Sequence, residues 1–458
     1  MDTPQKIERL GPILLAPGIS RNNAITKMYG AFIMVSMLTG MSFLQGYVLE
    51  VHLQIPRDQQ GTISGDLVFW AEVVSIFLYN PLGVLGDRIG RRPVFALGIL
   101  TTGIAYGLYP FATSVGELLV YRLIFGAGLA ATAGMMSAIT NDYPQEKSRG
   151  LFIGVTAMVN VLGVIFMASG IGRIPVLLTA NEWDPVAAGK VMFLVAAGLC
   201  LVTSFICHLG LKGGTAVARE DRENVRELFF SGMRAGKNPR VALAYAGAFA
   251  SRSDLVIKGM FLALWAIHDG RLLDMSPAEA MARFGLMIVI MQGASFIASP
   301  IFGWYIDQVN RVTSAIVALC FATVGYLSMY LITSPLDFAM APYFILISFG
   351  SSFMLKTSLS LLGQEARPKE RGSVFATAHI FGTIGIMIMV LVGGRTFDAW
   401  GPWAPFVIAG AYQSVLLVWA IVIRIKWPGP DLVGQRNWIP VFTAWVTAKV
   451  RPGETSQK

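Results

Sequence analysis

Charged side chains interrupt several long apolar stretches of this sequence, and ionisable groups in such surroundings are functional candidates because their burial is costly. The stretch AFASRSDLVIKGMFLALW at 248–265 contains Arg252, Asp254 and Lys258. On a helix Asp254 and Lys258 share one face and can pair, whereas Arg252 points elsewhere. A carboxylic acid in apolar surroundings can alternate between charged and neutral forms. Asp254 is therefore a candidate for proton exchange, and Arg252 and Lys258 are candidates for binding an anion.

Other apolar stretches carry further candidates of the same kind. Glu72 lies near the middle of 62–85 and Arg122 lies about one turn inside 117–140, and we group both with Asp254 as candidate coupling residues. Four more residues are candidate binding residues: Lys356, His379, Gln45 and Gln292. The alternative for each of these residues is structural, as a hydrogen-bonded core group or as a basic chain that reaches back to polar surroundings.

The elements that position these residues are predicted to be membrane-spanning helices. The chain has 458 residues, of which 54% are hydrophobic and 14% are charged, whereas soluble domains carry about 25% charged residues. A transmembrane helix needs about 20 mainly apolar residues. Twelve stretches meet this requirement, at approximately 28–49, 62–85, 93–112, 117–140, 150–172, 190–210, 241–267, 281–304, 312–333, 341–362, 373–394 and 404–425. We therefore expect an all-α integral membrane protein with twelve transmembrane helices.

The polar segments divide the chain into two six-helix halves, 28–210 and 241–426, joined by a loop at 211–240 and flanked by terminal segments at 1–27 and 427–458. Lys and Arg residues are concentrated in the connections on the side of the N-terminus, which predicts that both termini are cytoplasmic. The net charge of +9 comes from these short connections, so it does not indicate a nucleic-acid-binding face. The tail is expected either to lie on the membrane surface as an interfacial helix or to be partly disordered.

The connection after the second apolar stretch reads NPLGVLGDRIGRR at 80–92. Its motif residues are Gly83, Asp87, Arg88, Gly90, Arg91 and Arg92. A weaker copy follows the eighth stretch as Gly303, Asp307 and Arg311, where Gly83, Asp87 and Arg91 recur 220 residues further on. The segment lacks a Gly-Lys-Ser/Thr ending and a preceding strand, so it is not a phosphate-binding loop. The repetition indicates two related halves, as in alternating-access transporters.

These motif residues resemble the signature loop between helices 2 and 3 of the major facilitator superfamily, and the stretch from Arg122 to Ala131 is similar to the family's fourth-helix motif. The resemblance covers essentially the whole chain and implies the family fold of two pseudo-symmetric six-helix halves. It also implies that the loop gates the cytoplasmic side, with Asp87 meeting the N-terminus of helix 11 near Gly372. The fifth stretch departs from the pattern of family antiporters, because it lacks their Gly-Pro-rich motif.

The resemblance and the charged core together predict a secondary active transporter that works by alternating access. The excess of basic groups in the core of the second half favours proton-coupled symport of a small organic anion. One alternative is a proton antiporter for drug or siderophore efflux. Another is a non-transporting receptor or scaffold on the same fold.

The expected setting is the bacterial inner membrane, with the protein as a monomer. Its expected partners are a small-molecule substrate, protons and the lipid bilayer, with no nucleic acid, metal or cofactor. The sequence contains no His-Glu-x-x-His helix and no Gly-x-Ser-x-Gly elbow, so we do not expect an enzyme.

Overall fold

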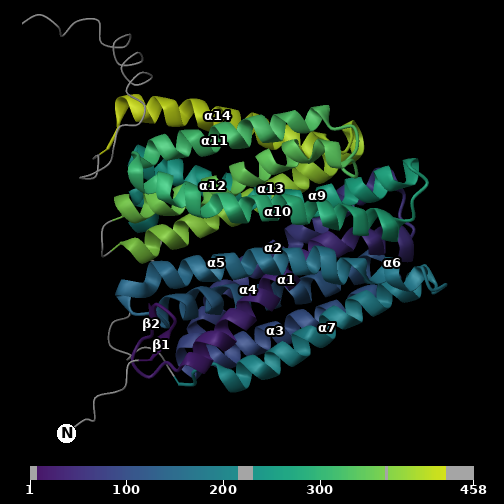
Figure 1. The fold of residues 1–458 in the computed structure, drawn as a ribbon, viewed down its shortest axis with the longest axis horizontal. Coiled ribbons are helices and arrows are strands. Elements are labelled where there is room, and N and C mark those ends of the chain that lie inside the picture. The colour runs from purple at the N-terminus through teal and green to yellow at the C-terminus, as the bar shows by residue number, and fades with distance from the viewer. Residues whose placement is uncertain (1–7, 215–230, 367–369, 430–458) are drawn as a thin grey trace, which may run out of the picture.

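The computed structural model describes residues 8–214, 231–366 and 370–429 of the chain. These residues form a bundle of long helices, preceded by a hairpin of β1 (Arg9–Leu10) and β2 (Ile13–Leu14) (Figure 1). The helices of the N-terminal half are α1 (Arg21–Tyr47), α2 (Arg57–Ile89), α3 (Arg91–Leu108), α4 (Val115–Asp142), α5 (Arg149–Ile165), α6 (Ile174–Thr179) and α7 (Pro185–Gly210). Those of the C-terminal half are α9 (Pro239–Leu272), α10 (Pro277–Gln308), α11 (Arg311–Ser328), α12 (Ala341–Glu365), α13 (Arg371–Trp400) and α14 (Ala404–Lys426).

Most of these helices match the length and composition of membrane spans. Within the described residues, 11 helical segments are long and apolar enough to cross a membrane, with α5 and α6 forming one such segment. Helix α9 is the remaining long helix; it has 34 residues and packs against α12 and α13, but it carries Arg252, Asp254 and Lys258. With α9 included, the predicted all-α architecture of two six-helix halves is confirmed.

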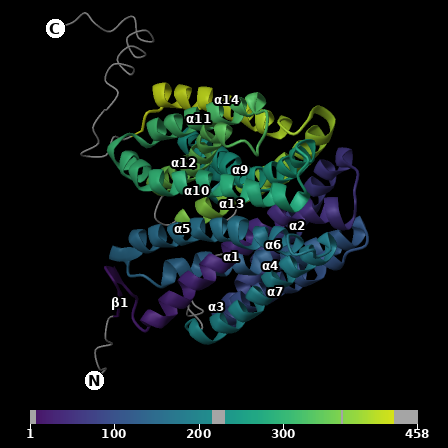
Figure 2. The same ribbon diagram turned by 45° about the vertical axis from the view of Figure 1, so that its right-hand side comes forward.

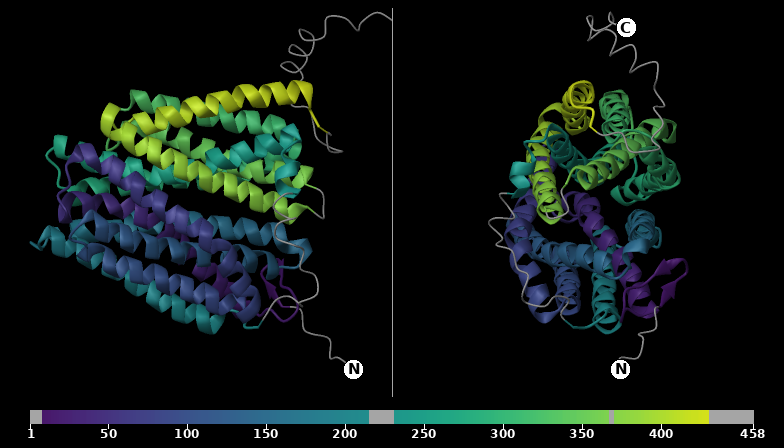
Figure 3. Two further views of the ribbon diagram at one scale, coloured as in Figure 1. Left: turned by 180° about the vertical axis from the view of Figure 1, so that it is seen from behind. Right: turned by 90° about the vertical axis from the view of Figure 1, so that its left-hand side faces the viewer.

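The two halves lie against each other along their length. Figures 1 and 2 show the N-terminal half in purple to teal and the C-terminal half in teal-green to yellow, with α10 next to α5 and α13 next to α2. The N-terminal hairpin and the end of α14 lie at the same end of the bundle (Figure 3). We call this the terminal end, and we call the opposite end, which holds His52 and Arg271, the distal end.

Residues 8–27, before the first predicted span, form the hairpin and the first turns of α1. Helix α1 begins at Arg21 instead of 28, because the Ser20 hydroxyl accepts from the Asn23 N–H at 3.1 Å and the Asn23 side chain accepts from the Ser20 N–H at 2.9 Å. The hairpin packs on the α4–α5 connection, where Leu15 forms an isolated bridge with Pro144. The predicted interfacial helix of the tail lies outside the described residues, which end at 429.

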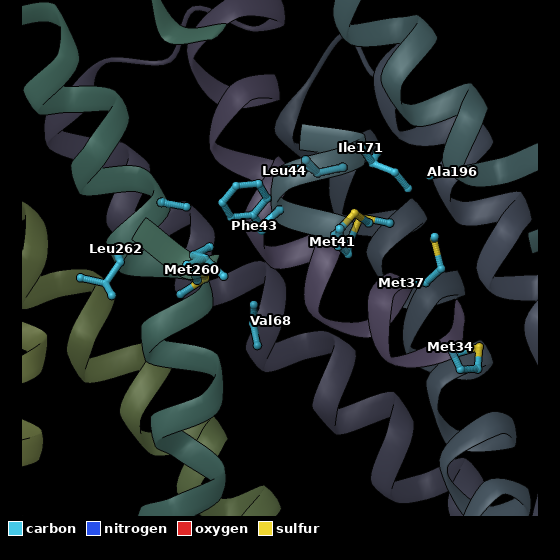
Figure 4. Packing of buried hydrophobic residues seen from close by; sticks show 14 of the residues in the cluster. Met34, Met37, Met41, Phe43, Leu44, Val68, Ile171, Ala196, Met260 and Leu262 are labelled. Atoms are coloured by element: carbon cyan, nitrogen blue, oxygen red, sulfur yellow. The ribbon is translucent and has the colours of Figure 1, made fainter. Parts of the chain in front are cut away.

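The largest apolar core crosses the boundary between the halves. Figure 4 shows Met260 of α9 in the same cluster as Phe43 of α1 and Val68 of α2. The Phe43 ring also stacks on that of Phe284 in α10, with centroids 6.3 Å apart. A second cluster is confined to the C-terminal half. Because burial of apolar side chains stabilises an interface, the shared core holds the halves together in this conformation.

The outer surface of the bundle is apolar as well. Phe77, Leu201, Phe205 and Ile297 are each more than half exposed. Cys320 is also exposed, although its apolar surroundings in the sequence predict burial. Large exposed apolar side chains on many sides of a helical bundle fit a surface that contacts lipid.

Candidate functional site

At the distal end, polar side chains from both halves meet between the helices. Glu50 follows α1 in a short π-helical turn and is 4% exposed, and its Oε1 lies 2.7 Å from Arg271 Nη2 of α9. The fully buried Gln60 donates to Glu50 Oε2 from its side-chain Nε2, and its Oε1 lies 3.0 Å from His268 Nε2. Hydrogen bonds to charged groups contribute roughly 1.5–3 kcal/mol each. These contacts therefore join α1 and α2 to α9 at this end.

A second polar contact at the distal end uses the main chain. The Asp398 carboxylate of α13 accepts from the Gly61 N–H at 2.8 Å and from the Thr62 N–H at 2.7 Å. A Cβ on Gly61 would lie 2.5 Å from Asp398 Oδ1 and 2.8 Å from the Gly394 carbonyl oxygen, so only glycine allows this approach. We call Glu50, Gln60, His268, Arg271 and Asp398 the distal network.

Between the halves, four polar side chains form what we call the central cluster: Glu72 and Tyr79 of α2, Arg252 of α9 and His379 of α13. The Tyr79 and His379 rings have centroids 5.0 Å apart. The Arg252 side chain packs against Gly382, one turn after His379 on α13, and Glu72 lies two turns before Tyr79 on α2. Each side chain is half-buried even though it lies deep between the halves. The cluster therefore borders space that solvent reaches inside the bundle.

Gly382 of α13 provides the room for Arg252. A Cβ at Gly382 would lie 2.2 Å from Arg252 Cδ, so a larger residue there would displace the arginine. Arg252 and His379 thus come from helices of one half and face Glu72 and Tyr79 of the other. From the sequence, Glu72 is a candidate coupling residue, whereas Arg252 and His379 are candidate binding residues. The structure places all three at the interface of the halves.

Arg122 of α4 lies inside the N-terminal half and is 2% exposed. Its Nη2 donates to Ser42 Oγ of α1 at 2.9 Å, and its guanidinium lies 4.9 Å from the centre of the Phe125 ring. Its Nε and Nη1 have no hydrogen-bond partner within the described residues. This burial excludes the alternative that the Arg122 side chain reaches polar surroundings outside the bundle.

Asp254 and Lys258 each bind a different helix instead of each other. Asp254 is 1% exposed, and the Gln413 side-chain amide of α14 lies 2.9 Å from both of its carboxylate oxygens. Lys258 donates to the Ser351 hydroxyl of α12. The spacing allowed a direct ion pair, but neighbouring helices offer each group a closer partner. Asp254 is sealed in the C-terminal half in this conformation.

The other candidate binding residues lie in different places. The Lys356 Nζ is buried and has no partner among the described side chains. Gln292 accepts from Ser348 Oγ at 3.2 Å and is half-buried in the C-terminal half. Gln45 is fully buried and accepts from the Tyr109 hydroxyl at 3.0 Å, so it packs inside the N-terminal half, away from solvent.

The signature motif lies at the terminal end, mostly within helices. Gly83 belongs to α2, and a Cβ there would meet nothing within 4 Å, so this glycine makes no turn or close contact in this conformation. Gly90 makes the turn with φ +100°, which favours glycine. Arg91 begins α3 and pairs with Asp142 at the end of α4, while Arg88 is exposed and Arg92 is half-buried. The Asp87 side chain lies outside what the structure describes.

The second copy of the motif repeats this arrangement. Gly303 lies inside α10, where a Cβ would meet nothing within 4 Å, and Arg311 begins α11, as Arg91 begins α3. Arg311 Nη1 lies 3.1 Å from Asp307 Oδ1. The internal repeat in the sequence thus corresponds to equivalent helix ends in the two halves.

Sequence reasoning missed the distal network. Its residues lie at helix ends or in short connections, where charged and polar residues are common and carry no special signal. The one feature that could have indicated it is the acidic Glu50 directly after an apolar helix, because a charge there needs a partner.

A two-halved bundle of apolar helices with charged groups at the interface of the halves defines a membrane protein of the transporter type. The family model described as Major Facilitator Superfamily matches residues 28–268 and 256–452. The chain belongs to the Major Facilitator Superfamily. This family and fold are those of non-enzymatic transporters.

Individual relatives are similar to this chain at 24% to 28% sequence identity. Magnetosome protein MamH of Paramagnetospirillum magneticum is 28% identical over 88% of this chain and 92% of its own length. Magnetosome protein MamZ of Magnetospirillum gryphiswaldense is 24% identical over 84% of this chain, which spans only 60% of that relative. The multi-drug resistance efflux pump PmrA of Streptococcus pneumoniae is 24% identical over 76% of this chain and 83% of its own.

A solved structure shares the fold. The crystal structure of the nucleoside transporter NupG is similar with a TM-score of 0.67 and 14% sequence identity, over 88% of this chain and 99% of that one. At this identity the similarity shows the fold alone.

Proposed function

We propose that this protein is a secondary active transporter that works by alternating access and moves a small organic anion together with protons. The observation that carries the proposal is the central cluster, in which Tyr79 of one half contacts His379 of the other, with Glu72 and Arg252 on the same two sides of this interface. Rocking of the halves would change the surroundings of both groups at once. An ionisable pair between moving halves is suited to link proton binding to that motion.

The two ends of the bundle differ in packing, and this difference supports alternating access. The distal network and the shared apolar core close the distal end, whereas Gly83 and Gly303 at the terminal end have open space around them. Small residues that contact nothing here are suited to close packing in a second conformation. We infer that the described conformation is open at the terminal end and that the motif glycines become contact points when this end closes.

The charge balance favours an anionic substrate. Arg252 borders the solvent-reached space, and Lys356 Nζ is buried without a partner among the described residues. Lys258 adds a third positive charge nearby in the C-terminal half. Among the described residues, Glu72 of α2 and Asp254 of α9 are the acidic side chains in the middle of the spans, and Asp254 is held by Gln413. A carboxylate or phosphate on the substrate would balance the remaining positive charge.

Orientation and setting follow from the distribution of basic residues. The terminal end carries most of the Lys and Arg residues of the connections, so we infer that it faces the cytoplasm of a bacterial inner membrane. Opening at that end then corresponds to an inward-facing state. We infer that the monomer is the transporting unit, because one chain supplies both halves.

The test is uptake into proteoliposomes that contain the purified protein. An imposed proton gradient should drive accumulation of an anionic substrate found by a ligand-induced thermal-shift screen, and the substrate should in turn drive proton movement in the same direction. The proposal fails if a broad panel of organic anions produces neither stabilisation nor proton movement.

A proton antiporter for efflux is the second candidate, and the similarity to the efflux pump PmrA supports it. The same proteoliposomes distinguish the two, because antiport moves protons against the direction of the substrate. The fifth span contains no proline between residues 149 and 174, and its one proline, Pro175, lies in the short closing helix α6. This departure from the pattern of the family's drug antiporters favours symport.

A further inference from the structure

A groove at the terminal end of the C-terminal half lies between α9, α13 and α14 and has a volume of about 530 Å³. Half of its lining residues are aromatic: Tyr245, Phe249, Phe381, Tyr412 and Trp419. The Tyr245 and Phe381 rings stack with centroids 5.3 Å apart, and the Phe249 and Tyr412 rings lie 5.0 Å apart. Paired rings give the groove fixed walls, so its shape does not depend on mobile side chains.

The groove opens toward the side of the bundle that contacts lipid. On α14, Val415 and Val418 are 66% and 63% exposed, and they adjoin the groove residues Tyr412 and Trp419. On α13 the exposed Ile384 lies one turn beyond Phe381. Exposed apolar side chains flank the groove on both helices, so its natural occupant is apolar along most of its length.

The mouth of the groove is basic. Lys237 lines it and is exposed, and the exposed Arg234 precedes it by one helical turn. The N-terminus of the long helix α9 begins just after, at Pro239, and adds the positive end of the helix dipole. Arg240 does not take part, because it pairs with Glu365 at 2.7 Å. An occupant therefore meets positive charge at one end and aromatic rings along the rest.

The length of the groove matches one leaflet of a bilayer. From Pro239 to Phe249 a helix rises about 15 Å at 1.5 Å per residue. One half of a hydrocarbon core roughly 30 Å thick is also about 15 Å. We propose that the groove binds one anionic phospholipid, with an acyl chain between the aromatic rings and the phosphate at Lys237.

A lipid in the groove would contact α9 and α13, the two helices that carry Arg252 and His379 of the central cluster. Phe249 lies one turn before Arg252 on α9, and a Cβ at Gly385 of α13 would lie 2.5 Å from the Phe249 carbonyl oxygen. Phe381 directly precedes Gly382, which provides the room for Arg252. A lipid in the groove thus contacts the turns of α9 and α13 that hold the charged site. Only this link to transport depends on the proposed function; lipid binding itself does not.

The test measures lipid retention. The detergent-purified full chain is incubated with equal amounts of phosphatidylglycerol and phosphatidylcholine, and bound lipids are counted by native mass spectrometry. We expect preferential retention of one phosphatidylglycerol. Lys237→Gln should lower that retention about fivefold, as expected for one basic group at a lipid surface. Ala246→Trp, which fills the groove, should abolish retention of both lipids at this site.

Matched controls separate the groove from general lipid contact. Lys147→Gln removes an exposed lysine at the same end of the bundle, and Leu201→Trp adds the same bulk to an exposed lipid-facing position on α7. Both should retain phosphatidylglycerol as the unaltered chain does. Equal retention of the two lipids, or unchanged retention in Lys237→Gln and Ala246→Trp, would overturn the proposal. Displacement of the lipid by inorganic phosphate alone would also overturn it and indicate a site for small anions.

Discussion

Arg271 Nη2 lies 2.7 Å from Glu50 Oε1, and this contact joins the last turn of α9 in one half to the end of α1 in the other. Glu50 is 4% exposed, so the pair has little competition from water on the acidic side. Arg57 Nε lies 3.9 Å from the same oxygen and adds a second positive charge. Because Glu50 and Arg271 belong to different halves, this contact exists only while the halves are together at the distal end.

The first prediction concerns this pair. Glu50→Gln should weaken closure of the distal end, because a buried hydrogen bond to a charged group contributes roughly 1.5–3 kcal/mol. Spin labels on α2 and α9 at the distal end should show a population with longer distances. Arg271→Gln should have the same effect, because it removes the positive partner that the other half supplies. Asp66→Asn is the control, because the Asp66–Arg395 pair is largely exposed and should contribute little.

The second prediction concerns proton coupling in the central cluster. Glu72→Gln keeps the size of the side chain and removes its ability to exchange a proton. We expect loss of accumulation driven by a proton gradient, with substrate exchange across the membrane retained. Glu182→Gln, at an exposed distal loop, is the matched control and should leave both activities unchanged. Full gradient-driven accumulation by Glu72→Gln would remove Glu72 from the coupling step.

The third prediction separates the two roles of Asp254. Asp254→Asn keeps a group that can contact Gln413, so folding should be intact, and gradient-driven accumulation should be lost if Asp254 exchanges protons. Gln413→Leu leaves a buried carboxylate without its donor and should lower stability by about 1–3 kcal/mol. Thermal unfolding measures the second effect. Unchanged accumulation by Asp254→Asn would assign Asp254 to structure alone.

The fourth prediction uses two glycines with opposite surroundings. Gly83→Leu should leave the described conformation stable, because nothing lies within 4 Å of a Cβ there, but should hinder closure of the terminal end. Gly61→Ala should do the reverse, since its Cβ would lie 2.5 Å from Asp398 Oδ1. Cysteine accessibility at each end distinguishes the two. Identical labelling patterns for both variants would contradict this account of the motif glycines.

Much of the fold could be predicted from the sequence because membrane helices are defined by local composition. Twelve apolar stretches and a repeated Gly–Asp–Arg pattern are visible without any knowledge of contacts. The central cluster could be predicted only in part, since Glu72 and His379 stand out as polar groups in apolar runs but their partners depend on how the halves pack. Nothing in the sequence indicates that Gln413 is the partner of Asp254, although it determines the surroundings of that carboxylate.

The contact of Asp398 with the Gly61 and Thr62 amides has a consequence for engineering this protein. The donors belong to the main chain, so no substitution can reverse their polarity. The Glu50–Arg271 contact joins two side chains, so a change in one can be matched by a change in the other, whereas Asp398 has no partner side chain to alter. The two polar contacts of the distal end therefore differ in how they tolerate sequence change. The Glu50–Arg271 contact can change through paired substitutions, whereas the contact of Asp398 requires an acceptor side chain at position 398.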